Sequence, residues 1–166
     1  MNVNKAARSS GFTLVEMMIV IGVLGILMAI ALPNFSQWIA SERVRGAAND
    51  LYSGLMMARS EAMKRNVQVD VTRTSGSSTD WSAGWSVKLT GGTVFQTQDA
   101  SSAVTITGPS AGTVSYSYTG RPVTASIDAE FVASSTNYSS EVPARYVCIT
   151  LSGMPVVKRC ACTTVC

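Results

Sequence analysis

Residues 11–32 read GFTLVEMMIVIGVLGILMAIAL, a stretch that is apolar after the glycine apart from Thr13 and Glu16. At the rise of an α-helix, its apolar part extends roughly 30 Å, which is the thickness of the hydrocarbon core of a bilayer. Lys5 and Arg8 precede this stretch, and basic residues beside a membrane helix hold that side in the cytoplasm. The sequence therefore predicts a membrane-inserted helix that delivers the rest of the chain to the other side.

Three interpretations of this helix compete. An ordinary signal peptide also has a basic start, and Ala29-Ile30-Ala31 resembles its small-residue cleavage site. Against it, the apolar run is too long, and Pro33 follows that site closely. A plain membrane anchor leaves Glu16 unexplained, because a charge inside a bilayer costs roughly a few kcal/mol and calls for a partner. The third interpretation accounts for Glu16 and depends on the residues that surround it.

The segment Gly11-Phe12-Thr13-Leu14-Val15-Glu16 resembles the motif of type IV prepilins. The resemblance implies that a prepilin peptidase cuts after Gly11 and that the new first residue, Phe12, is N-methylated. It also implies that Glu16 pairs with the terminal amine of a neighbouring subunit, and because the cost of the charge is removed only when the two helices match, this carboxylate would fix the register between subunits. Residues 1–11 would then be a leader peptide that is removed.

The helical pattern continues past the apolar stretch to about residue 66. Apolar residues recur mostly three or four apart, and most charged residues lie off this stripe, which consists of Trp38, Ala48, Leu51, Leu55, Ala58 and Ala62. We expect a helix over 12–66, with residues 12–32 as its membrane-spanning or filament-core part and its second half covered by a sheet. Arg59, Lys64 and Arg65 form a small basic cluster that suits the C-terminal end of the helix dipole.

Beyond the helix, the period of the sequence changes to two. Val67, Val69 and Val71 alternate with polar residues, and turns rich in Gly, Ser and Pro separate further strand candidates. Those candidates are residues 84–89, 93–98, 103–107, 113–118, 127–132, 145–151 and 155–159, with a loop over 133–143. Residues 67–166 are thus a β-rich head, with one antiparallel sheet or two small ones laid on the second half of the helix. The expected fold class is α+β.

The cysteines cluster near the C-terminus, at Cys148, Cys160, Cys162 and Cys166. An even number in an exported chain indicates disulfides, and four cysteines allow three connectivities among which the sequence does not choose. In one arrangement, a hairpin that turns at Ser152-Gly153 places Cys148 opposite Cys160, and Cys162 and Cys166 close a small loop. The alternative is a zinc site of four thiolates, although the paired C-x2-C spacing typical of structural zinc is missing.

Composition excludes several classes of function. The chain has no histidine, which rules out Ser-His-Asp and Cys-His catalysis and any histidine-bearing metal site. With no Gly-rich phosphate loop either, we expect no enzymatic activity, no cofactor and no metal. Without residues 1–11, which carry two of the 13 basic residues, 11 basic and 10 acidic residues remain, so a generally basic nucleic-acid binder is not indicated. Trp81 and Trp85 are more typical of a core than of a platform for stacking bases.

Further features are similar to the FimT/FimU/GspH group of minor pilins and pseudopilins. They are the ARSEA run at Ala58–Ala62, the Trp81–Trp85 block, Gly120-Arg121-Pro122, and Val147-Cys148-Ile149 with Ser152-Gly153. The resemblance implies a subunit that primes or caps a filament. Some FimT-like members bind DNA through a Gly-Arg-x-Arg element, but the equivalent stretch here, Gly153-Met154-Pro155-Val156, lacks the arginines. Arg145, Lys158 and Arg159 remain as candidates for phosphate contacts, which would be few and sensitive to salt.

The leading functional hypothesis is therefore structural: a minor type IV pilin that initiates or caps a pilus. Its expected partners are other pilin subunits, the prepilin peptidase and the inner membrane. It would sit in the bacterial inner membrane with its head in the periplasm, and at the cell surface after assembly. The alternatives are a GspH-like pseudopilin of a type II secretion system and a FimT-like receptor that binds nucleic acid for DNA uptake.

Overall fold

The computed structural model describes residues 11–123 and 129–164, and the side chains of all of these except 31–34. The described residues belong to two compact units, one that ends at Ser36 and one that begins at Gln37. Each unit is described by itself.

One long helix, α1 (Leu14–Arg65), opens the described chain. It begins after Thr13, whose Oγ1 accepts a hydrogen bond from the backbone N–H of Glu16 at 3.2 Å, as an N-cap residue does. It ends at Asn66, which has a positive φ of 55°, and the N–H of Val67 donates to the carbonyl of Ala62 at 3.2 Å. This is the Schellman arrangement that closes helices. The predicted end near residue 66 is confirmed.

No single described helix is both long and apolar enough to pass as a membrane span. Two helical stretches, Leu14–Ile30 and Phe35–Arg65, pass that test only when they are taken together as a bent pair, and then by length and composition alone.

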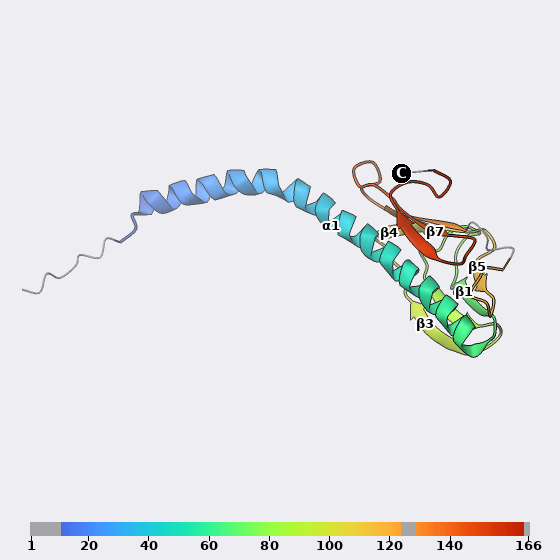
Figure 1. The fold of residues 1–166 in the computed structure, drawn as a ribbon. Helices are drawn as coiled ribbons and strands as arrows, with labels where there is room; N and C mark the ends of the chain where they lie inside the picture. The colour runs from blue at the N-terminus through green and yellow to red at the C-terminus, as the bar shows by residue number, and fades with distance from the viewer. Residues whose placement is uncertain (1–10, 124–128, 165–166) are drawn as a thin grey trace, which may run out of the picture. The chain divides into compact units, whose positions relative to one another are not determined.

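The head contains two antiparallel sheets of four strands each, which confirms the predicted α+β class (Figure 1). The first sheet has the order β3-β2-β1-β5 and the second the order β4-β6-β7-β8. The strands are β1 (Val69–Arg73), β2 (Trp85–Leu89), β3 (Val94–Gln98), β4 (Val104–Thr107), β5 (Thr113–Tyr116), β6 (Glu130–Ser135), β7 (Arg145–Ile149) and β8 (Pro155–Lys158).

The core lies between the second half of α1 and the two sheets. Figure 1 shows both sheets beside this half of the helix. The helix contributes a buried stripe of Ala40, Val44, Ala48, Leu51, Leu55, Ala58 and Ala62. Trp38 was expected in this stripe, but it is 59% exposed. At about 100° per residue, Trp38 projects roughly a third of a turn away from the centre of the stripe. Trp81 and Trp85 are fully buried, which confirms them as core residues.

The loop expected over 133–143 begins later than predicted. Strand β6 continues to Ser135, which pairs with Val104 of β4, and Ala133 and Ser135 are both buried. Small side chains such as those of Ala133 and Ser135 also fit where a strand packs closely against the core, so the start of this run is strand. Part of the predicted strand over 127–132 lies outside the described residues.

Candidate functional site: the apolar helix segment and the C-terminal region

The predicted cleavage position lies in an open, non-helical segment ahead of α1. Gly11 has no other group within 4 Å of the place where a Cβ would be built, and Phe12 is 75% exposed. Both residues that flank the predicted cleavage site are therefore exposed. Cleavage there and methylation of Phe12 stay predictions, and the remainder of the expected leader lies outside the described residues.

Glu16 occupies the third position of α1, one turn after Thr13. Because Thr13 accepts a bond from the Glu16 N–H, the two residues form half of a capping box, in which a Glu or Gln at this position is favoured. An acidic residue in the first turn also interacts well with the helix dipole. The ion pairs within the described part of the chain involve other residues, so the Glu16 carboxylate has no intramolecular cation there.

The large apolar side chains of the N-terminal unit are exposed on every side of the helix. They include Leu14, Val15, Met17, Met18, Ile19, Val20, Ile21, Val23, Leu24, Ile26, Leu27, Met28 and Ile30. A helix that is apolar all round needs lipid or other helices around it, and a contiguous exposed apolar surface of this extent marks an interaction site. Gly22 and Gly25 leave open space where a neighbouring backbone can approach closely.

The C-terminal region is held by a disulfide between Cys148 of β7 and Cys162, whose Cα atoms are 5.6 Å apart. The arrangement that placed Cys148 opposite Cys160 is wrong. In the β7–β8 hairpin, Cys148 lies opposite Val156. Cys160 therefore comes after the position opposite Cys148, and the chain turns back beyond β8 so that Cys162 reaches Cys148. Glu130 of β6 accepts a hydrogen bond from the Cys162 N–H at 2.6 Å and helps to fix this return.

These sulfurs are disulfide-bonded and therefore do not form the thiolate zinc site that was the alternative. Cys160 is also disulfide-bonded, and Cys166 lies outside the described residues. Glu130 lies close to the sulfurs of Cys148 and Cys162, but sulfurs joined to each other are not available as thiolate ligands.

The candidate phosphate-contacting residues separate into two places. Arg145, the first residue of β7, and Arg159, just after β8, line one cavity together with Arg45 of α1. Lys158 instead lines a different cavity beside Cys148 and Cys162. Burial lowers the pKa of the Arg145 guanidinium, and the positive charges of Arg159 and Arg45 lower it further. Arg45 was missed by sequence reasoning, because nothing local distinguishes it from the other charges on the exposed face of the helix.

The basic residues at the end of α1 have structural partners. Arg59 donates from Nε to the carbonyl of Gly120 at 3.0 Å and from Nη2 to the carbonyl of Ser152 at 3.3 Å. Lys64 and Arg65 pair with Glu61, and the hydrogen bond from Arg65 is the main cause of the lowered pKa of the Glu61 carboxyl. These contacts favour the structural role that the helix-end cluster was predicted to have.

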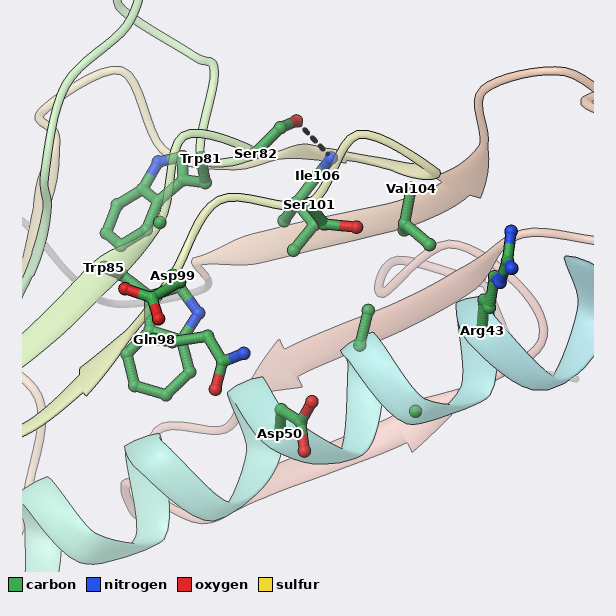
Figure 2. A pocket seen from close by; sticks show the side chains of 13 residues that line it. Arg43, Asp50, Trp81, Ser82, Trp85, Gln98, Asp99, Ser101, Val104 and Ile106 are labelled. Atoms are coloured by element: carbon green, nitrogen blue, oxygen red, sulfur yellow. Dashed lines mark hydrogen bonds between the residues drawn. The ribbon is translucent and has the colours of Figure 1, made fainter.

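A third cavity, of about 200 Å³, lies between α1 and the segment that runs from Trp81 to Trp85, the first residue of β2 (Figure 2). Arg43 and Asp50 line it from the helix, and the Oγ of Ser82 accepts a hydrogen bond from the Ile106 N–H at 2.8 Å. The tryptophans form its inner wall and are part of the core. Trp81 makes an edge-to-face contact with Phe131, with centroids 4.8 Å apart.

Comparison with known proteins agrees with this arrangement. The model of the family "Type II transport protein GspH" matches residues 47–154, and that of the prokaryotic N-terminal methylation motif matches residues 6–32. The type IV major pilin protein PilA of Myxococcus xanthus is 48% identical over 44 residues, which are 26% of this chain and 20% of that protein. A fimbrial protein of Pseudomonas aeruginosa is 37% identical over 59 residues, 36% of this chain and 38% of that protein. The chain thus spans well under half the length of the curated relatives it matches.

Among solved structures, the crystal structure of the type IV minor pilin FimU of Pseudomonas aeruginosa is similar. The TM-score is 0.58 at 22% sequence identity, and the match covers 69% of this chain and 91% of that one. This likeness establishes a shared fold. Since the GspH model matches more than half of the chain, the protein belongs to the GspH family and carries the prokaryotic N-terminal methylation motif, within the FimT/FimU/GspH group that its sequence resembles.

Proposed function

We propose that this protein is a minor type IV pilin, a structural subunit that joins a pilus at its start or tip and has no catalytic role. The observation that carries the proposal is the exposed apolar helix from Leu14 to Ile30. Nothing in the described part of the chain covers it, so membrane lipid and then sister helices are its partners. The N-terminal methylation motif and the shared fold with a minor pilin support the same function.

The proposed sequence of events starts in the inner membrane, with the head in the periplasm. The prepilin peptidase cuts after Gly11, and Phe12 is methylated. The helix then leaves lipid for a bundle of other pilin helices. Glu16 has no cation of its own within the described residues, and in a low-dielectric bundle an unpaired carboxylate is strongly penalised. A terminal amine on the neighbouring subunit removes this penalty only when the two helices are in register.

Glu16 has a second, purely local role as a capping residue, and substitution can separate the two. Glu16→Gln keeps a side chain favoured at the third position of the capping box but removes the charge. If Glu16 only caps the helix, the Gln variant joins pili normally and Glu16→Ala is the weaker variant. If Glu16 supplies the counter-charge, both variants are inserted and processed but are absent from pili.

The measurement is the amount of each variant in the sheared filament fraction relative to the membrane fraction. We expect the amount of each variant in the filament fraction to fall at least about tenfold. A neighbouring terminal amine left without its counter-charge costs more than about 1.4 kcal/mol. Glu42→Gln, an exposed change on the same helix that removes the same charge, is the matched control. Normal incorporation of Glu16→Gln would refute the counter-charge mechanism. Intact-mass and N-terminal analysis of the same fraction would refute processing if the mature chain began anywhere but Phe12.

The family match also favours one alternative, a pseudopilin of a type II secretion system. Both functions use the same helix, the same processing and the same Glu16 chemistry. Deletion of the gene distinguishes them: loss of pili and twitching supports the pilin, whereas loss of protein secretion with pili intact supports the pseudopilin.

A further inference from the structure

An unfavourable arrangement of charges lies where β7 begins and β8 ends. In the hairpin, Tyr146 lies opposite Lys158, and the same register continued by one residue places Arg145 opposite Arg159. Like charges directly opposite each other on antiparallel strands are destabilising. The next residue across the sheet, on β6, is Ala133, which supplies no compensating charge.

A third guanidinium adds to this pair from a different element. Arg45 of α1 lines the same cavity of about 260 Å³, together with Asn49 and Val157. Three arginines from three parts of the chain thus meet at one opening. Such convergence of like charges opposes folding unless something offsets it.

Arg145 is largely covered along its length, while its guanidinium stays in contact with solvent at the cavity. Only 8% of the residue is exposed, and within the described ranges its guanidinium forms no hydrogen bond and no ion pair. The Glu42 carboxylate acts on it electrostatically, but that carboxylate is already bound to Arg45 at 2.6 Å. A guanidinium that is free of protein partners at such an opening can pair with an anion, because its fork is matched in shape to carboxylate and phosphate.

We propose that this cavity, named here the arginine pocket (Arg45, Asn49, Arg145 and Arg159), binds a phosphate group, either as inorganic phosphate or as the terminal group of a phosphomonoester. The charges decide between the oxyanions. The guanidiniums of Arg45, Arg145 and Arg159, together with the Glu42 carboxylate that pairs with Arg45, leave an excess of two positive charges. A carboxylate and a phosphodiester each carry one negative charge, whereas a phosphomonoester carries about 1.5 to 2 at neutral pH. The Asn49 amide adds an uncharged donor.

The pocket is independent of the proposed pilin function. It lies in the unit that begins at Gln37, and none of its residues belongs to the apolar helix segment.

The test is titration calorimetry of the full chain in a non-ionic maltoside detergent and a phosphate-free buffer of low ionic strength. The probes are inorganic phosphate, glycerol 3-phosphate, acetate, and a single-stranded oligonucleotide without terminal phosphates. We expect both phosphate probes to bind more tightly than acetate or the oligonucleotide. A difference between the two phosphate probes then identifies free phosphate or a monoester as the better ligand.

Arg145→Gln and Arg159→Gln are each expected to weaken phosphate binding by about tenfold or more, since each removes charge-assisted hydrogen bonds. Arg43→Gln is the matched control, because it removes the same charge from the exposed face of α1, outside the pocket, and it should bind phosphate as the parent does. Near-UV circular dichroism verifies that each variant is folded. If Arg145→Gln does not fold, Arg159→Gln, which changes an exposed residue, tests the proposal instead.

Three results would overturn the proposal: no binding of either phosphate probe, acetate binding as tightly as phosphate, or equal weakening by the Arg43→Gln control. Tighter binding of the oligonucleotide, lost on Arg159→Gln, would also overturn it and would identify the pocket as a phosphodiester site for DNA.

Discussion

The contact between Gly54 of α1 and Trp85 of β2 permits a prediction whose sign depends on the packing of the helix. In a helix interior, alanine is favoured over glycine by about 1 kcal/mol. A Cβ at residue 54, however, would overlap Cη2 and Cζ3 of the Trp85 indole. That ring is 1% exposed, so it has little room to move. Overpacking of this kind costs about 1–3 kcal/mol, and Gly54→Ala should therefore lower the free energy of unfolding by about 0–2 kcal/mol.

Gly46→Ala on the same helix is the matched control, because nothing lies within 4 Å of a Cβ at that position. The free energy of unfolding of Gly46→Ala should rise by about 1 kcal/mol, which is the whole difference in helix propensity between alanine and glycine. The difference between the two variants, about 1–3 kcal/mol, isolates the overpacking. At roughly 3–5 °C per kcal/mol for a domain of this size, the two melting temperatures should be well separated.

The assay is thermal unfolding of the full chain in a non-ionic detergent, followed by the near-UV circular dichroism of the buried tryptophans. If Gly54→Ala melted at or above the temperature of Gly46→Ala, the close approach of the helix to Trp85 would be refuted, and with it the way in which the core of the head is assembled.

Two further predictions concern the second sheet. Gly153→Ala should destabilise the chain by more than about 1 kcal/mol, because Gly153 has a φ of +82° and a Cβ would overlap the carbonyl of Gly120. Gly91 has a φ of +74° and open space around it, so Gly91→Ala should show only the cost of the unfavourable backbone conformation. Equal losses of stability for the two variants in chemical denaturation would contradict the contact between Gly153 and Gly120. Replacing both Cys148 and Cys162, which are 14 residues apart, by serine should remove about 3 kcal/mol, and a loss below about 1 kcal/mol in the same assay would argue against the pairing.

Much of the fold follows from local patterns. The period of 3.6 in α1 and the period of 2 in the head have direct physical causes, since one face of each element is buried. Turn residues such as Ser152-Gly153 fix where strands end, and Gly153 does adopt the positive φ that its type permits. For this reason the strand over Pro155–Lys158 agrees closely with the predicted one.

What could not be predicted depends on register and on distant partners. The pairing of Cys148 with Cys162 depends on which residue of β8 lies opposite Cys148, and turn signals leave that uncertain by a few residues. That Arg45 and Arg145 line one cavity depends on how a helix lies against a hairpin about 100 residues further along the chain. Trp38 was misassigned because its hydrophobicity was given more weight than its angle around the helix, which lies roughly a third of a turn from the buried stripe.

Arg59 gives the end of α1 an additional consequence. Its two hydrogen bonds reach the turn at Gly120, which follows a strand of the first sheet, and the turn at Ser152, which joins two strands of the second. A mechanical load that enters the head along the helix is therefore shared between both sheets through one side chain. A subunit stretched in a fibre would distribute tension over its whole head instead of peeling away one hairpin at a time.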